Sequence, residues 1–172
     1  MQELLTDFLS ISYHELEKLN LEAKEKRRDR SDINLSVLEK KYREYLEKTE
    51  SIKAITVAFS DLEGRFHMLD YDKKYLLESS NNLTFDGSSV RGFSSVYESD
   101  LRLKLDWASF YWLPSDIFGA GKVAIFADIY TRGGEVHSSD FRARLKMYLN
   151  DLHEKGLEVN IGNELEGFLF EG

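Results

Sequence analysis

The chain has 172 residues, of which 42% are hydrophobic and 31% charged, as expected for one globular domain or a small domain with part of another. Thirty-one acidic residues against 23 basic ones give a formal charge of −8 at pH 7, which argues against a nucleic-acid partner. The lack of cysteine excludes disulfides, thiolate metal sites and a cysteine nucleophile. No apolar run is long enough to span a membrane and no signal-peptide core opens the chain, so we expect a cytoplasmic protein with no membrane partner.

The first 50 residues contain neither glycine nor proline and are rich in Leu, Glu, Lys and Arg, a composition that predicts helices. An apolar stripe opens an amphipathic helix, and Ser12 with Glu15 predicts an internal capping box, so one bent helix or two short ones both fit the pattern. Ser36 with Glu39 predicts a second capping box, which starts another helix. The charged run between the two boxes is expected to be a solvated helix end or connection.

A change of sequence period marks the start of a β-rich region. Residues 52–59 and 65–71 predict a hairpin, because Gly64 between them can supply the positive φ that a short hairpin loop often needs. Farther along, a short helix is expected at 73–80, strands at 100–107, 110–114 and 123–130, and a helix at 141–152. Asp140 is the predicted N-cap of that last helix and Gly156 lies at a usual stop position. The chain then closes as a predicted strand over residues 157–172, interrupted or bulged near Gly162.

The stretch 82–100, NLTFDGSSVRGFSSVYESD, is predicted to be a long ordered loop that carries a functional site. It mixes serines, glycines and acidic residues with large apolar side chains, which a plain solvated linker would not carry. The apolar residues expected to hold the loop in place are Phe85, Val90, Phe93, Val96 and Tyr97. Ordered loops of this length tend to carry function.

Glu164 and Glu166 form a candidate metal-binding pair. On a strand, positions i and i+2 point to the same face, about 7 Å apart at ~3.3 Å per residue. Two carboxylates held on an inward face repel each other unless a cation lies between or beside them, and oxygen ligands select hard cations such as Mg²⁺ or Mn²⁺. The spacing alone equally fits the solvated acidic face of an exposed strand. No dinucleotide fingerprint, P-loop or nucleophile motif accompanies the pair.

Three segments resemble one known family. FDGSSVRGFSSVYESDLRL (85–103) resembles the FDGSS–G–ESD loop of the glutamine synthetases. IGNELEGFLF (161–170) is similar to the metal-binding strand of that family, and DFRARLK (140–146) to the start of one of its helices. The resemblance covers about residues 52–172.

The strands and the short helix expected over residues 52–130 predict an α+β fold class, and the resemblance implies the same class. It implies a helical N-terminal extension over residues 1–50, a β-grasp domain over 51–135, and the incomplete start of a catalytic α+β domain over 136–172. The helical extension is longer than the usual N-terminus of the family.

The resemblance also implies a reaction. Glutamine synthetases join ammonia to glutamate through a γ-glutamyl phosphate, with ATP as co-substrate and divalent cations, Mg²⁺ or Mn²⁺, at the phosphates. Their active sites form between neighbouring subunits of a homo-oligomeric ring. Asp86 matches the catalytic loop aspartate, which binds the ammonium ion and takes its proton, and Ser89 belongs to the same substrate-binding motif. Glu164 and Glu166 match two metal ligands, one for each of two ions.

Several positions depart from the family pattern. Leu105 and Phe141 replace prolines, and Gly167 replaces an aromatic residue beside Glu166. The remaining metal ligands, the nucleotide-binding segments and the substrate arginines of the family have no counterpart in these residues, so the chain alone is expected to be inactive. Two alternatives stay open: a non-catalytic interaction or regulatory module of a glutamine synthetase ring, and part of a ligase that couples glutamate to another amine.

Overall fold

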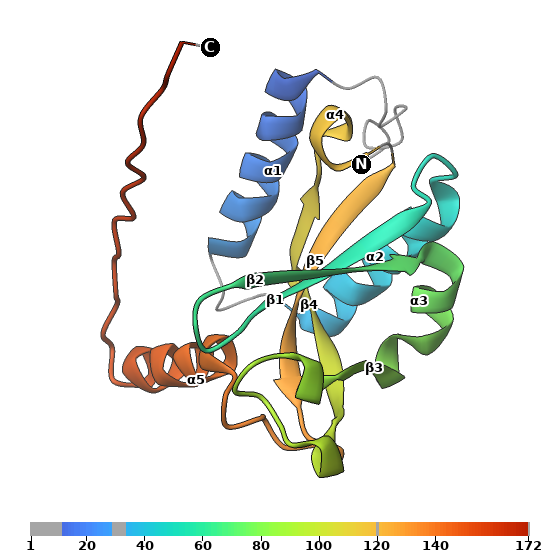
Figure 1. Cartoon of the computed structure of the whole chain (residues 1–172). Helices are drawn as coiled ribbons and strands as arrows, with labels where there is room; N and C mark the ends of the chain where they lie inside the picture. The colour runs from blue at the N-terminus through green and yellow to red at the C-terminus, as the bar shows by residue number, and fades with distance from the viewer. Residues whose placement is uncertain (1–11, 29–33, 120, 172) are drawn as a thin grey trace.

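The computed structural model describes residues 12–28, 34–119 and 121–171, and the described residues form a five-stranded sheet (Figure 1). The strands are β1 (Ala54–Ser60), β2 (Phe66–Asp72), β3 (Leu83–Asp86), β4 (Asp100–Trp112) and β5 (Lys122–Tyr130). Their order across the sheet is β2-β1-β5-β4-β3. β1 and β5 are parallel and the other neighbours are antiparallel, so the sheet is mixed.

Helices precede, interrupt and follow the sheet. They are α1 (Tyr13–Arg28), α2 (Leu35–Lys48), α3 (Lys73–Ser79), α4 (Ser115–Phe118) and α5 (Phe141–Glu154), with short 3₁₀ turns η4 (Ser80–Asn82), η5 (Gly87–Ser89) and η6 (Val96–Glu98). No helix in the described ranges is long and apolar enough to cross a membrane. Helices together with a mostly antiparallel sheet confirm the predicted α+β class.

The core lies on one face of the sheet and is covered by α2. Alternate residues of β5, such as Ile125 and Ile129, are fully buried on this face. From α2, Leu46 is fully buried, and the Tyr42 ring stacks on Phe110 of β4 with 4.3 Å between centroids. The opposite face of the sheet carries the polar residues that contact α5.

The local sequence signals were confirmed at most element ends. The hairpin pairs Ser60 with Phe66, and Gly64 has a φ of 77° in its turn. Ser12 and Glu15 form the predicted capping box, in which the Glu15 carboxylate accepts from the Ser12 backbone N at 3.1 Å and from its Oγ at 2.8 Å. The short helix predicted at 73–80 is present as α3. The apolar stripe predicted before Ser12 lies outside the described residues.

The second predicted capping box was wrong. Asn34, not Ser36, caps α2, because its side-chain oxygen accepts from the backbone N of Ser36 and of Val37. Ser36 lies inside the first turn and donates its own Oγ to Asn34 at 2.6 Å. Glu39 instead forms an ion pair with Arg43, four residues later on the same helix.

The strands expected at 100–107, 110–114 and 123–130 are confirmed. The first two are parts of one continuous strand, β4, which ends at Trp112 and changes register between Leu105 and Phe110. Two other predictions were wrong. The start of the expected loop 82–100 is itself the edge strand β3. The closing strand expected at 157–172 is not formed: residues 157–171 are extended and exposed, and none of them pairs with a strand of the described sheet. A strand needs a hydrogen-bonding neighbour, which local propensity cannot supply.

Candidate functional site

The loop from η5 to η6 leaves and re-enters the sheet at one point. β3 and β4 are antiparallel, and their last pair joins Asp86 to Asp100, so the two ends of the loop lie opposite each other. The Gly87 backbone N donates to the Ser99 carbonyl at 2.7 Å and closes the base of the loop. The register of β3 and β4 thus places Asp86 and Asp100, the acidic residues at the two ends of the loop, next to each other.

Buried aromatic and aliphatic side chains hold the loop, as the sequence predicted. Val90 and Phe93 are buried, and the Phe93 ring packs edge-on to Phe59 and Phe85 with centroids 6.1 and 6.2 Å away. The His137 ring stacks on Phe93 with 5.6 Å between ring centroids. The loop is therefore an ordered structure fixed to the domain core.

The far end of the loop contrasts with this anchored part. Val96 and Tyr97, which were predicted to help hold the loop, are exposed, with Tyr97 99% exposed. Both lie on η6, whose residues point away from the core, so that part of the prediction was wrong. A pocket of about 330 Å³ opens beside them and is lined on its other side by Arg132 and His137. Sequence reasoning missed this pocket because its walls come from segments 30 residues or more apart.

Asp86 has both carboxylate oxygens engaged by its own motif. Oδ1 accepts from the Ser88 backbone N at 2.9 Å and from the Ser88 Oγ at 2.6 Å. Oδ2 accepts from the Ser89 Oγ at 2.6 Å. These bonds from Ser88 and Ser89 hold the pKa of the exposed Asp86 carboxyl below its usual value. The group is thus ionised at neutral pH and faces solvent.

Gly87 follows Asp86 at a position with no room for a side chain. A Cβ placed on Gly87 would lie 2.5 Å from the Leu101 Cδ1 and 2.7 Å from the Ser94 Oγ. The glycine therefore leaves room for the side chains of Leu101 and Ser94 to pack directly against the backbone beside Asp86.

Two contacts fix the loop from outside. Arg91 forms an ion pair with Glu63 of the β1–β2 turn at 3.0 Å, between exposed groups. Ser139, just before α5, donates its Oγ to the Gly92 carbonyl at 3.0 Å. The loop thus touches the hairpin on one side and the approach to α5 on the other.

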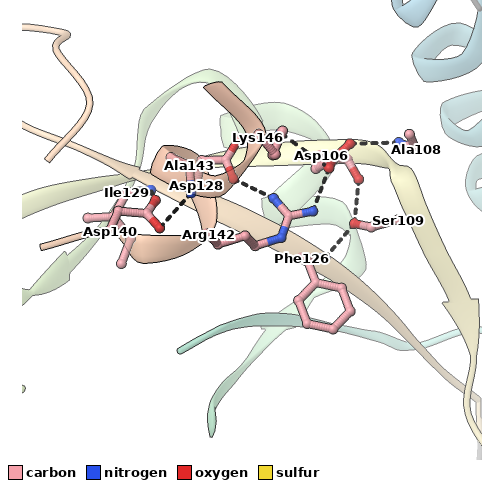
Figure 2. Close-up of polar contacts among 10 residues, drawn as sticks. All are labelled: Asp106, Ala108, Ser109, Phe126, Asp128, Ile129, Asp140, Arg142, Ala143 and Lys146. Carbon is pink, nitrogen blue, oxygen red and sulfur yellow. Dashed lines mark hydrogen bonds and ion pairs between the residues drawn. The ribbon is translucent and has the colours of Figure 1, made fainter. Parts of the chain in front are cut away.

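Helix α5 is fixed to the sheet by its cap. The buried Asp140 carboxylate accepts from the backbone N of Ala143 at 3.0 Å, which caps the helix as predicted. Its second oxygen accepts from the backbone N of Ile129 in β5 at 2.6 Å (Figure 2). One side chain therefore starts the helix and joins it to the sheet.

A cluster of four charged side chains makes the second attachment of α5. Arg142 donates to Asp106 of β4 at 2.6 Å and also to Asp128 of β5, and Lys146 donates to Asp128 at 2.6 Å (Figure 2). Burial alone would raise the pKa of the Asp106 carboxyl, but the hydrogen bond from Arg142 and the charges of Lys146 and Arg142 lower it on balance. Asp106 therefore stays ionised at neutral pH although it is partly buried.

The register change in β4 gives this cluster its geometry. Between Leu105 and Phe110 the strand bulges, and the ladder with β5 is interrupted there. The Ser109 Oγ accepts from the Phe126 backbone N at 2.8 Å and donates to the Asp106 carbonyl at 2.6 Å (Figure 2). The hydroxyl thus satisfies a backbone N–H of β5 where the β4–β5 backbone pairing is interrupted. The bulge places the Asp106 carboxylate beside Arg142.

The two predicted metal ligands lie apart from the loop. Glu164 and Glu166 are exposed on the segment that extends away from α5 (Figure 1), and neither forms a hydrogen bond or ion pair with any described residue. Within the described ranges, no group of three or more His, Cys, Asp or Glu side chains could hold a metal ion. Two carboxylates alone supply only part of the six ligands that Mg²⁺ takes, so the described residues hold no complete site for a divalent cation. The structure thus brings Asp86 and Ser89 together but not the two glutamates with them.

Comparisons with known proteins show which family this chain resembles. Residues 51–132 match the family model described as the glutamine synthetase β-grasp domain. A glutamine synthetase of Methanosarcina mazei is 34% identical over 125 residues, and one of Thermotoga maritima is 32% identical over 121 residues. These matches cover 72% and 70% of this chain, which spans 28% of each relative. The cryo-electron microscopy structure of a Plasmodium falciparum glutamine synthetase has a TM-score of 0.59 at 23% identity, covering 68% of this chain and 23% of that one.

Proposed function

This chain carries the β-grasp domain of the glutamine synthetase family, and from that premise we propose that it takes part in the ATP-dependent ligation of ammonia to glutamate. The observation that carries the proposal is the Asp86 loop. An ionised and exposed carboxylate, oriented by two serines and directly opposite Asp100, concentrates negative charge on a rigid loop. Such a site attracts a small cation such as ammonium.

Asp86 is the proposed catalytic residue of the loop. Ammonium first gives up one proton, which passes to Asp86. The nitrogen of the resulting ammonia attacks the carbonyl carbon of γ-glutamyl phosphate, the carbon–oxygen bond to phosphate breaks, and the leaving phosphate takes the second proton lost by the nitrogen. The lowered pKa favours the cation-binding part of this role, because a weak base is a poor proton acceptor. Ser89 acts through Asp86 by orienting its Oδ2, and so shapes the substrate site.

Glu164 and Glu166 are the proposed ligands for Mg²⁺ or Mn²⁺, one for each of two ions. When bound, divalent cations neutralise the charge that develops on a transferring phosphoryl group. The proposal requires that the extended segment meet further oxygen or nitrogen donors, because the described residues offer no complete donor set. For the same reason we propose that this chain alone does not catalyse the ligation.

The proposed partner is a second copy of the chain, because Asp86 and the two glutamates lie apart in one copy. Asp86 lies on the loop and the two glutamates lie beyond α5, so the proposed site forms when Asp86 meets the metal-binding side of a neighbouring subunit in a homo-oligomer. Its proposed small-molecule substrates are glutamate, ammonium and ATP. Residues 136–172 are the proposed start of the catalytic domain, and the Arg142 cluster would then fix that domain to the β-grasp sheet.

A chimaera tests the function. Residues 51–132 replace the matching segment of the Thermotoga maritima relative, and ATP- and metal-dependent glutamine formation is measured. The proposal predicts an active chimaera, loss of activity with Asp86→Ala, and no loss with Glu78→Gln, which removes an exposed acid on α3. A folded, assembled but inactive chimaera, or equal activity with Asp86→Ala, would contradict it and favour a non-catalytic module.

A further inference from the structure

A second pocket, away from Asp86, lies along the edge of β4 where β3 ends. β3 pairs only as far as Leu83 with Leu103, and beyond that pair η4 borders β4 instead. The pocket has a volume of about 340 Å³, at the small end of the range for ligand sites. The lining side chains used below are Ser80, Asn81, Arg102, Lys104, Trp107 and Tyr130.

Both cations of this pocket lack an acidic partner. In register, Lys104 lies opposite Asp128, but that carboxylate accepts from Arg142 and Lys146. Arg102 lies between Thr84 of β3 and Tyr130 of β5, neither of which is acidic. Neither Arg102 nor Lys104 forms an ion pair with any residue in the part of the chain that the structure describes. In a chain with a formal charge of −8, two unpaired cations at one pocket require an explanation.

The one acid of the pocket is already neutralised. Glu39 lines the pocket, but its carboxylate accepts from the Arg43 Nε at 2.8 Å. Arg43 is itself held by the Leu77 carbonyl, by the Ser80 hydroxyl and by the Trp107 ring, whose centroid lies 5.2 Å from the guanidinium carbon. The Glu39–Arg43 pair is therefore a fixed part of the wall, and the pocket keeps the positive charge of Arg102 and Lys104.

The remaining wall suits a small anion with polar groups. The Lys104 Nζ lies 5.0 Å from the centre of the Tyr130 ring, which holds the ammonium group without neutralising it. Ser80 and Asn81 add a hydroxyl and a carboxamide. A guanidinium presents paired donors to the oxygens of a phosphate or carboxylate, and an ammonium adds a point charge.

We propose that this pocket binds a small dianion, a phosphate-bearing or dicarboxylate metabolite, through Arg102 and Lys104. The ligand would also influence the Asp86 loop, because Arg102 pairs with Thr84, two residues before Asp86 on β3. Occupancy would therefore stabilise the β3–β4 pair at the base of that loop. The site is independent of the proposed ligase activity.

The test is a titration of the full chain with inorganic phosphate and, separately, with succinate, at constant ionic strength balanced by NaCl. Binding is followed through the Trp107 indole resonance and the backbone resonances of Arg102 and Lys104. Saturable shifts at these residues with either anion support the proposal, and the tighter anion identifies the ligand class. Shifts no larger than those caused by NaCl would overturn it.

Charge-matched variants separate the site from general electrostatics. Arg102→Gln with Lys104→Gln should weaken binding at least tenfold, whereas Lys74→Gln with Lys155→Gln, which removes two exposed cations elsewhere, should leave it unchanged. Equal weakening by both pairs would overturn the proposal. If the first pair fails to fold, the single change Lys104→Gln, at an exposed side chain, still decides between the two outcomes. Bound anion should also slow amide exchange at residues 83–86, and unchanged exchange there would contradict the coupling to the loop.

Discussion

Asp86 of β3 and Asp100 of β4 are directly opposed cross-strand partners, so the loop between them begins and ends with a carboxylate on the same face of the sheet. Like charges in this position oppose strand pairing. The hydrogen bonds from Ser88 and Ser89 to Asp86 offset the repulsion and keep Asp86 ionised. The loop is therefore built to hold negative charge, and its properties should depend on pH.

The first prediction concerns the titration of Asp86. Because its folded pKa is depressed, its contribution to stability is complete at neutral pH and is lost as pH falls through the folded pKa. Carbon-detected NMR should find a pKa below the ordinary aspartate value of about 3.9. Ser88→Ala and Ser89→Ala should each raise it, whereas Ser95→Ala, on the exposed part of the loop, should not. An unperturbed Asp86 would show that these bonds do not form in solution.

The second prediction concerns the charged cluster that fixes α5. Arg142→Gln leaves Lys146 as the one cation of the cluster for Asp106 and Asp128. The free energy of unfolding should therefore fall by about 2 kcal/mol, less than for a fully buried pair because the Arg142 side chain is a quarter exposed. Chemical denaturation measures the change. Arg144→Gln, on the exposed side of the same helix, is the control and should change stability by less than about 0.5 kcal/mol.

The third prediction concerns the close approach at Gly87. Gly87→Ala places a methyl group against Leu101 and Ser94, so we expect a loss of about 1–3 kcal/mol and faster amide exchange across the loop. Gly133→Ala is the matched control, because its Cβ would lie 3.6 Å from the nearest atom, the Thr131 Oγ1. A loop that accepts alanine at position 87 without cost would mean that Leu101 moves aside freely.

The fourth prediction concerns the helix that precedes the β-grasp domain. Asn20 of α1 donates to the Trp112 carbonyl and accepts from the Trp112 backbone N, both at 3.1 Å, as a neighbouring strand residue would. Asn20→Ala leaves both backbone groups of this buried residue without that partner and should destabilise the chain by about 1–3 kcal/mol. Leu21→Ala, at a half-exposed neighbour, should have little effect. Amide exchange at Trp112 should accelerate only in the Asn20 variant.

Local chemistry made part of this structure predictable. The Gly64 hairpin, the Asp140 cap and the burial of Val90 and Phe93 each follow from a few neighbouring residues. The contacts of Arg142 and of Asn20 join segments far apart in the chain, and no local pattern reveals them. The prediction of a closing strand was wrong for the same reason, because a strand forms only where a neighbouring strand can pair with it, and local propensity does not reveal that neighbour.

The candidate site, too, could be predicted only where its residues are close together in the sequence. The FDGSS motif placed Asp86 beside Ser89, since both lie within one short turn. The i, i+2 spacing predicted that Glu164 and Glu166 share one face of a strand, but residues 157–171 form no strand, and the spacing could not supply the other donors that a cation needs. The pocket at Arg102 and Lys104 was not predicted, because the sequence shows neither that Lys104 lies opposite Asp128 nor that Asp128 pairs with cations of α5 instead.

The central claim is that Asp86 binds the ammonium substrate, and the most direct test is the ammonium dependence of the chimaera at saturating glutamate and ATP. Asp86→Asn keeps the size of the side chain but removes its charge, so kcat/KM for ammonium should fall at least ~100-fold. The KM for ATP should stay unchanged, and Glu78→Gln should match the parent. An Asp86→Asn chimaera with the parent's kcat/KM for ammonium would contradict the claim.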